Sequence, residues 1–380
     1  MPAKPALRRS RLTLTVADRN PRTRSGGHQV RIDDFGGGDD IVFEQLGRAG
    51  VVTLNRPKAL NAVNHDMILA LGRALDAWET DSDVDAVVVK AEGRAFSAGG
   101  DILDIYKAGK AGNPRYEFFA DEYRLNARLY RFTKPYVSLI DGIVMGGGVG
   151  ISCHGSHRVM TENAVFAMPE VGIGFFPDVG GSRILSAIKG EFGTYLGLTG
   201  TRIRYGDALW AGLATHAVSQ ADLPLLVEEI AQSGDPDRAL QPFRQEPPRE
   251  TDDATLHEIA NAFLPDTIED LVAGLKQRAE AGDAFCRKAF ETICQKSPTS
   301  LKVSLVQIRT GVALSMDECM AMEYRILNRM LVGHDFYEGI RAVIVDKDNK
   351  PVWKPADLAE VSDADVAAYF APLGDRELEM

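Results

Sequence analysis

The sequence is poor in cysteine, and its cysteines are not arranged as a disulfide framework. Four cysteines occur in 380 residues, and none belongs to a Cys-x-x-Cys pair. Such usage is typical of a reducing compartment. Long apolar runs are also missing: no stretch approaches the roughly 18 apolar residues that a membrane-spanning helix needs. The sequence therefore predicts no membrane partner.

Positive charge is in deficit, and the common nucleotide-binding motifs are absent. The formal net charge is -11, which argues against nucleic acid as the main partner, although a local basic groove for a phosphorylated small molecule stays open. No G-x-G-x-x-G segment and no P-loop occurs, which counts against nicotinamide chemistry and nucleotide hydrolysis. We expect no separate cofactor.

The first 31 residues differ in charge from the rest of the chain. They hold eight Lys and Arg residues against one acid, Asp18, with no apolar segment of the kind found in secretory signals. Two interpretations stay open: a disordered basic tail, which we favour, and a mitochondrial transit peptide. The glycine- and aspartate-rich residues 33–40 are then a linker, so that residues 1–40 form the tail.

Periodic apolar residues predict alternating strands and helices beyond that tail. A strand is expected over residues 50–54, a helix capped by Asn64 that runs to about Glu79, and a buried strand over 84–91. Further short strands and glycine-terminated helices follow to about residue 218. This alternation indicates an α/β fold, for which a doubly wound sheet is the default.

Composition suggests where the chain divides. Residues 232–253 are rich in Pro, Asp and Glu, as in a linker or a long surface connection. We therefore expect a core over residues 41–231 and a helical C-terminal region over 254–380. Ser297 before Pro298 is a typical helix start within that region.

Three glycine-rich loops are each predicted to follow a strand: residues 98–101, 146–148 and 172–181. Glycine lets a backbone N–H approach a ligand oxygen without a side chain in the way. Two such N–H groups that converge on one carbonyl oxygen would form an oxyanion hole. Residues 168–181, which include the third loop, also carry Glu170 and Asp178 in an otherwise apolar stretch, where an unpaired charge is costly. Such acids are candidates for proton transfer or nucleophilic attack.

The loop sequences resemble a known family. The segments NRPKALNAV, GRAFSAGGDI, IDGIVMGGGVGIS and FAMPEVGIGFFPDVGGS are similar, in the same order, to those of the crotonase (enoyl-CoA hydratase/isomerase) superfamily. The match covers about residues 41–231. Later segments, among them MEYRI and GHDFYEGIRAVIVDKDNKPVWKPADL, resemble the 3-hydroxyisobutyryl-CoA hydrolases of that superfamily and extend the similarity to about residue 361.

The resemblance implies a spiral of ββα units with a helical C-terminal region, in place of the doubly wound sheet. It implies an acyl-CoA thioester as the substrate, with CoA as part of that substrate. The backbone N–H groups of Ala98 and Gly147 would form the oxyanion hole. Gly99, Gly100 and Asp101, with the loop at residues 58–62, would line the CoA site.

One departure from the hydratases selects the subfamily. Hydratases carry a second glutamate at the position of Gly150, so hydration by two carboxylates is not expected here. The resemblance instead adds Asp178 and Glu122 to Glu170 as acids of the hydrolases. Glu170 would attack the thioester or activate water, Asp178 would bind the 3-hydroxyl or move protons, and Glu122 would assist. The predicted activity is hydrolysis of 3-hydroxyisobutyryl-CoA in valine catabolism, with enoyl-CoA hydratase or isomerase as the alternative.

Several features lead to weaker expectations. Cys153, His154 and His157 match no zinc spacing, so no metal site is predicted. Arg341 and Lys354 would neutralise CoA phosphates or form surface ion pairs, and the sequence does not choose between these roles. A homo-oligomer is an open option. A bacterial cytoplasm is the preferred location, with the mitochondrial matrix as the alternative.

Overall fold

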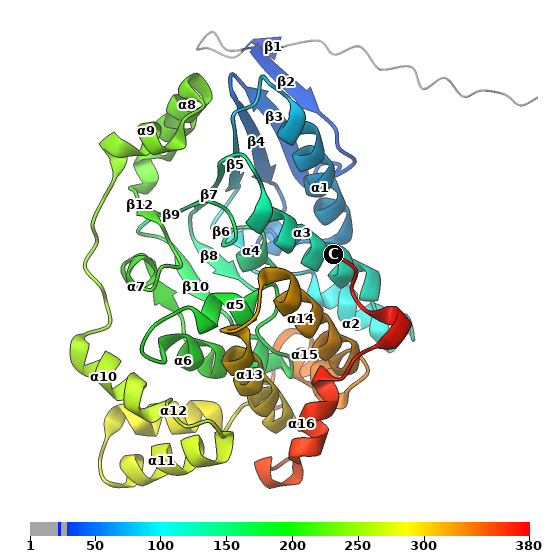
Figure 1. The fold of residues 1–380 in the computed structure, drawn as a ribbon, viewed down its shortest axis with the longest axis vertical. Helices are drawn as coiled ribbons and strands as arrows, with labels where there is room; N and C mark the ends of the chain where they lie inside the picture. The colour runs from blue at the N-terminus through cyan, green and yellow to red at the C-terminus, as the bar shows by residue number, and fades with distance from the viewer. Residues whose placement is uncertain (1–21, 24–28) are drawn as a thin grey trace, which may run out of the picture.

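The computed structural model describes residues 22–23 and 29–380, and it contains two β-sheets (Figure 1). The order of the eight-stranded sheet is β1 (Arg22–Thr23), β2 (Gln29–Asp33), β3 (Ile41–Leu46), β4 (Ala49–Leu54), β5 (Ala86–Ala91), β7 (Tyr136–Ile140), β9 (His157–Met160) and β12 (His216–Ala217). The order of the four-stranded sheet is β11 (Ile203–Arg204), β10 (Val165–Ala167), β8 (Ile143–Met145) and β6 (Ala95–Ser97). Strands β1 to β4 pair antiparallel, whereas β4, β5, β7, β9 and β12 pair parallel.

Consecutive strands alternate between the two sheets. Strand β5 lies in the larger sheet and β6 in the smaller one, and the pairs β7–β8 and β9–β10 repeat this pattern. Helical segments follow each pair before the chain returns to the larger sheet. The fold is therefore the spiral of ββα units that the family resemblance implies, and the doubly wound default is wrong.

Helices flank these sheets and form most of the second half of the chain, and those after residue 250 gather toward the end of the molecule opposite strands β1 to β4 (Figure 1). The helices up to residue 240 are α1 (His65–Thr80), α2 (Ile102–Lys110), α3 (Tyr116–Arg131), α4 (Gly147–Gly150), α5 (Gly181–Ser186), α6 (Phe192–Thr199), α7 (Tyr205–Trp210), α8 (Leu223–Ser233) and α9 (Pro236–Leu240). Those after residue 250 are α10 (Asp253–Ala262), α11 (Ile268–Glu280), α12 (Ala284–Ile293), α13 (Pro298–Gly311), α14 (Met316–Met330), α15 (His334–Ile340) and α16 (Asp363–Phe370).

Local sequence signals account for several helix ends. The Asn64 side chain accepts a hydrogen bond from the Met67 N–H and so caps α1, as the sequence predicts. Ser297 caps α13 in the same way, with Pro298 at its first position. The predicted apolar face of α1 is buried, including Trp78, which packs against the rings of Phe35 and Phe43.

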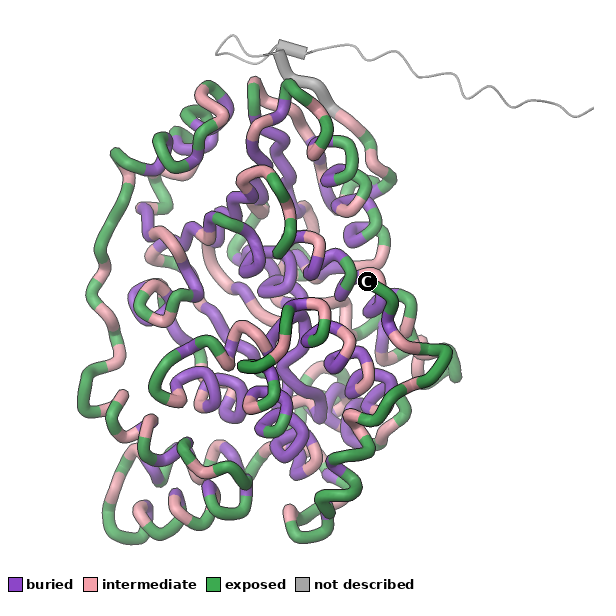
Figure 2. Tube along the Cα trace, viewed as in Figure 1, coloured by how far each residue is buried: buried purple, intermediate pink, exposed green. Residues whose placement is uncertain are grey.

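One apolar core joins the strands to the C-terminal helices. It includes side chains of α5 and α6 together with Ile308 of α13 and Met320 of α14. Helix α13 packs on α5, and α14 packs on α3. Figure 2 shows the buried residues concentrated along the strands and the inner helices, with exposed residues on the outer turns. The C-terminal helices therefore complete the core of the β-rich part.

The chain boundaries differ in detail from the expectation. Residues 29–33 form β2, which pairs with β3 from Val30 opposite Leu46 to Asp33 opposite Phe43, so ordered structure begins before residue 41. The tail prediction for residues 1–21 and 24–28 lies outside the described residues. Residues 232–253 contain the end of α8 and helix α9, then a largely exposed connection to α10. Within the described part of the chain, no helix is both long and apolar enough to cross a membrane.

Candidate active site

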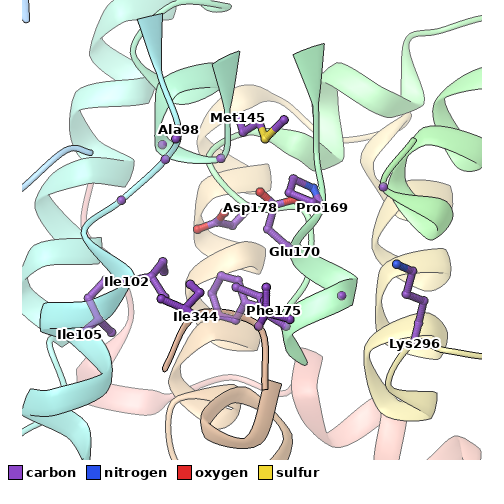
Figure 3. Close-up of a pocket in the computed structure, with 18 of the residues that line it drawn as sticks. Ala98, Ile102, Ile105, Met145, Pro169, Glu170, Phe175, Asp178, Lys296 and Ile344 are labelled. Carbon is purple, nitrogen blue, oxygen red and sulfur yellow. The ribbon is translucent and has the colours of Figure 1, made fainter. Parts of the chain in front are cut away.

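Three neighbouring parallel strands of the smaller sheet end at one edge, and each leads directly into a predicted site segment. Strand β6 ends at Ser97 before residues 98–101, β8 ends at Met145 before Gly146 and Gly147, and β10 ends at Ala167 shortly before Glu170. Because parallel strands end at the same edge of a sheet, segments far apart in sequence meet there. Figure 3 shows Ala98, Met145, Pro169 and Glu170 at these three strand ends.

A cavity of about 690 Å³ opens at this edge. Several of the predicted residues line it at the end next to the sheet. Among them are two glycines, Gly100 and Gly147, and three acids, Glu122, Glu170 and Asp178. Apolar side chains line much of the rest, among them Phe118 and Phe119. Figure 3 shows four others: Ile102, Ile105, Phe175 and Ile344. An apolar cavity with a few polar groups at one end is typical of a site for a small organic ligand.

The backbone N–H of Gly147 belongs to the lining of this cavity and has no hydrogen-bond partner among the described residues. Gly147 opens α4, so its N–H has no acceptor within the helix. A Cβ atom on Gly147 would lie 3.1 Å from the Gly100 nitrogen and 2.6 Å from Glu122 Oε1. No backbone or side-chain acceptor of the described residues takes the N–H of Gly100 or Gly147. These two donors flank a space that glycine keeps open.

The prediction that the backbone N–H of Ala98 donates to the oxyanion hole is wrong. The Ala98 N–H donates to the Leu60 carbonyl at 2.9 Å, and a donor already bound within the fold cannot also stabilise a substrate oxygen. Ala98 still lines the cavity. The free donor in this loop belongs to Gly100, two residues further along the chain.

Asp101 and residues 58–62 also have other roles than the expected one. The Asp101 carboxylate caps α2 through the Asp104 N–H and pairs with Arg56 at 3.0 Å, and Asp101 does not line the cavity. In the loop at 58–62, the buried Asn61 amide donates to the carbonyls of Glu92 and Ala95, each at 2.8 Å. This loop therefore holds the segment that leads into residues 98–101.

Three buried acids reach the cavity from three different elements. Glu122 comes from α3, Glu170 opens the 3-10 turn Glu170–Ile173, and Asp178 lies in the connection that follows. Tyr123 donates its hydroxyl hydrogen to Asp178 Oδ2 at 2.9 Å. Glu122 Oε1 and Glu170 Oε2 are buried and have no hydrogen-bond partner within the described residues. Figure 3 shows the carboxyl groups of Glu170 and Asp178 close together at the end of the cavity.

Burial changes the protonation of all three acids. Desolvation raises the pKa of Glu122 well above its usual range, and the nearby Asp178 raises it further. The same two causes raise the pKa of Glu170. Desolvation raises the pKa of Asp178 to about 7, with the hydrogen bond from Tyr123 acting in the opposite direction. A carboxyl group with a pKa near neutral pH, such as that of Asp178, is suited to proton transfer.

Three basic side chains line the same cavity, and the sequence analysis did not identify them. They are Arg202 and Lys350, which are exposed, and Lys296, which is partly buried. None of the three forms an ion pair with a carboxylate of the described residues, so their charge is available to a ligand. Arg341 is not available, because it pairs with Glu338 and two aspartates. These cations come from separate loops, and no sequence motif joins them.

The three acids of the cavity are not grouped closely enough to form a metal site. Among the described residues, the one group of side chains whose ligand atoms lie close enough together to hold a metal ion is Glu258, Asp283 and Cys286. Arg278 already pairs with both acids of that group, at 2.7 Å in the case of Asp283. Cys153, His154 and His157 are buried, and His154 Nε2 lies 2.7 Å from the Val179 carbonyl oxygen.

Comparison with known proteins decides the family. Residues 49–370 match the model of the enoyl-CoA hydratase/isomerase family. The chain belongs to the enoyl-CoA hydratase/isomerase family. Among its curated relatives, the mitochondrial 3-hydroxyisobutyryl-CoA hydrolase of Danio rerio is 44% identical, over 90% of this chain and 92% of that protein. The protein of the same name from Homo sapiens is 40% identical, over 94% and 95% of the two chains.

Solved structures of the enoyl-CoA hydratase/isomerase family share the fold. A protein described as a carnitinyl-CoA dehydratase from Mycobacterium thermoresistibile superimposes with a TM-score of 0.85 at 42% identity, over 90% of this chain and 99% of that one. A protein described as an enoyl-CoA hydratase from Rhodobacter sphaeroides gives a TM-score of 0.81 at 38% identity, over 90% and 100% of the two chains. The names of the curated relatives and of these two solved structures therefore differ in the reaction that they state.

Within this family, the surroundings of Gly150 bear on that difference. A Cβ atom at Gly150 would lie 2.9 Å from Asn126 Nδ2 and 2.9 Å from Val179 Cβ. Asn126 is fully buried on α3, one helical turn after Glu122. The place where the hydratases hold a second glutamate is thus filled by two other side chains, so the glycine is a packing requirement here.

Proposed function

We propose that this protein is an acyl-CoA thioester hydrolase that converts 3-hydroxyisobutyryl-CoA to CoA and 3-hydroxyisobutyrate, a step of valine catabolism. The observation that carries the proposal is the filled space at Gly150, next to three buried acids and two free backbone donors. Hydration of an enoyl group by two glutamates would need a second carboxylate at position 150, and the packing there leaves no room for it. Thioester hydrolysis needs one nucleophile or base and a polarised carbonyl, and those groups are present. The names of the curated relatives support the same reaction.

The proposed reaction starts from the thioester carbonyl, whose oxygen accepts hydrogen bonds from the N–H groups of Gly100 and Gly147. Each such donor typically lowers the barrier by about 3 kcal/mol when negative charge develops on the oxygen. Glu170 attacks the carbonyl carbon through a carboxylate oxygen. The carbon–sulfur bond breaks, and the sulfur leaves with the bonding electrons and takes up a proton. Water then cleaves the mixed anhydride. In the alternative path, Glu170 removes a proton from a water molecule that attacks the thioester directly.

Asp178 and Glu122 have supporting roles in this proposal. Asp178, with a pKa of about 7, can donate a proton to the leaving sulfur and recover it from water at neutral pH. Glu122 has an unpartnered Oε1 beside Gly147, and it can hydrogen-bond the 3-hydroxyl of the acyl group. A site built to bind a hydroxyl group discriminates strongly against an analogue that lacks it, because the buried polar group then loses its partner.

The CoA portion would extend from the acids past the apolar lining to the basic side chains. CoA carries phosphate groups, and Lys296, Lys350 and Arg202 are cations with no carboxylate partner among the described residues. Charge-assisted hydrogen bonds from such groups hold phosphates in place. CoA enters this scheme as part of the substrate, and no additional cofactor is required for the reaction.

An enoyl-CoA hydratase is the rival function, favoured by the name of the solved structure from Rhodobacter sphaeroides described above. The deciding experiment follows free-thiol release from 3-hydroxyisobutyryl-CoA and, in parallel, loss of the enoyl absorbance of crotonyl-CoA. Thiol release without hydration is the expected result. Hydration without thiol release would overturn the proposal and would mean that another acid replaces the glutamate absent at position 150.

The cellular setting and the assembly are part of the proposal. The curated relatives are named as mitochondrial proteins, which supports the mitochondrial matrix, while the bacterial cytoplasm stays the other option. A homo-oligomer is compatible with the fold, and measurement of the molecular mass in solution would decide this point. Neither nucleic acid nor a membrane is needed as a partner.

A further inference from the structure

The connection that carries Asp178, residues 177–182, is held by buried side chains from other parts of the chain. Glu323 of α14 accepts hydrogen bonds from the Gly180 N–H at 2.8 Å and from the Ser182 N–H at 3.0 Å. It also accepts the Ser182 hydroxyl hydrogen. Glu323 is fully buried. One carboxylate thus binds three donors of a single short segment.

Two further side chains fix the same segment. The Gln307 amide of α13 donates to the Pro177 carbonyl at 2.5 Å and to Ser182 Oγ at 3.1 Å. His154 Nε2 lies 2.7 Å from the Val179 carbonyl oxygen, which can act only as an acceptor, so that nitrogen carries the hydrogen. Together with Glu323, these contacts reach the residues on both sides of Asp178.

The segment has a conformation that needs such support. Val179 adopts a φ of 51° and Gly180 a φ of 88°. A left-handed conformation is unfavourable for a β-branched residue such as valine and persists where the surroundings enforce it. Val179 directly follows Asp178, so relaxation of Val179 to an extended conformation would rotate the peptide group that orients the Asp178 side chain.

We propose that Glu323 is a positioning residue of this enzyme: it acts through residues 180–182 to hold Asp178 in its reactive position. The proposal rests on the proposed hydrolase function. It assigns the helical C-terminal region a direct part in the reaction, because α14 supplies the carboxylate and α13 supplies Gln307. It also explains why a buried acid lies so close to the site without lining the cavity.

The test is a double-mutant cycle between Glu323→Gln and Asp178→Asn, with thiol release as the readout. The Gln side chain keeps the shape but loses one of the two carboxylate acceptors. Since misplacement of a reacting group by about 1 Å can cost roughly 100-fold in rate, we expect Glu323→Gln to lower kcat about 10- to 100-fold with KM within about twofold. In the Asp178→Asn background, the same change should lower kcat less than about twofold, because the group that it positions is already gone.

A matched control separates positioning from general stability. Asp207 is another buried carboxylate that accepts a backbone N–H and a hydroxyl, both from Thr251, away from the cavity. Asp207→Asn should leave kcat of the folded protein unchanged. If Glu323→Gln does not fold, Gln307→Leu takes its place in the cycle with the same expected result.

Two results would overturn the inference. One is an unchanged kcat in folded Glu323→Gln, and the other is a multiplicative loss of rate in the double variant. If the wild-type protein released no thiol at all, the proposed hydrolase function itself would be wrong. That outcome is therefore distinct from a failure of the positioning role of Glu323, which requires an active wild-type protein.

Discussion

At the residue scale, the site depends on acids that the fold keeps away from water. Glu122, Glu170 and Asp178 are each at most 6% exposed. Apolar rings surround them, with Phe175 packed between Phe119, Phe176 and Phe336. Dry surroundings favour the protonated form of a carboxyl group and make its ionised form more reactive. The same burial should lower the stability of the fold.

Asp178 provides a test of that stability cost. Its pKa in the folded protein, about 7, lies above the ordinary value of 3.8. The stability that this proton contributes is therefore fully present below about pH 4 and is lost as the pH rises through 7. Asparagine resembles the protonated form at every pH. We expect Asp178→Asn to raise the free energy of unfolding at pH 8 by about 1–4 kcal/mol.

Urea unfolding at pH 8 and at pH 5 measures this effect, and the gain should be smaller at pH 5. Asp375→Asn, in an exposed turn, is the control and should change neither value. A variant that is less stable than the wild type at pH 8 would contradict the account of the Asp178 carboxyl.

At the element scale, the ends of three parallel strands place the reacting groups. Glycine at position 147 is required there, because a Cβ atom would lie 2.6 Å from Glu122 Oε1 and 3.1 Å from the Gly100 nitrogen. We expect Gly147→Ala to lower kcat at least about 100-fold, the loss typical for one oxyanion-hole donor. Thiol-release kinetics on folded protein checks this prediction.

Gly72 provides the matched control for that substitution. It lies in α1 with nothing within 4 Å of a Cβ atom. Gly72→Ala should leave kcat unchanged and stabilise the protein by about 0.5–1 kcal/mol. Wild-type turnover in Gly147→Ala would show that the proposed oxyanion hole lies elsewhere.

Much at this scale was predictable from the sequence, and the exceptions have a physical reason. The cap at Asn64, the helix start at Ser297 and the strand before Glu92 depend on local residues, and the structure confirms them. The Ala98 prediction was wrong because the direction of a backbone N–H depends on pairing with a distant segment, here Leu60. The Asp101 prediction was wrong for a similar reason, because the direction of its side chain depends on an ion pair with the distant Arg56.

At the scale of the whole molecule, the cavity is assembled from both halves of the chain. The acids come from residues 122–178, whereas Lys296, Lys350 and Trp353 come from the helical C-terminal region. The sequence indicated this region as helical but gave no sign that its cations line the site, since no motif joins positions 202, 296 and 350. Only the packing of α13 to α15 against the spiral brings them together.

These cations lead to a prediction about CoA binding. The double variant Lys296→Met/Lys350→Met should raise KM for the acyl-CoA and Kd for free CoA about 3- to 10-fold, with kcat little changed. A charge that is in contact with solvent typically contributes up to about 1 kcal/mol to binding, and salt screens this contribution. Titration calorimetry at low and high salt measures this, and Lys189→Met, at an exposed site outside the cavity, is the control. Unchanged affinity at low salt would place the phosphates elsewhere.

The most direct test of the account is thiol release from 3-hydroxyisobutyryl-CoA by the wild-type protein and by Glu170→Gln, measured side by side. Glutamine keeps the shape of the side chain but is neither a nucleophile nor a base. The account predicts rapid thiol release by the wild type and a loss of at least about 1,000-fold in the variant, with CoA affinity retained. Near-normal hydrolysis by folded Glu170→Gln would contradict the central role given to this buried acid.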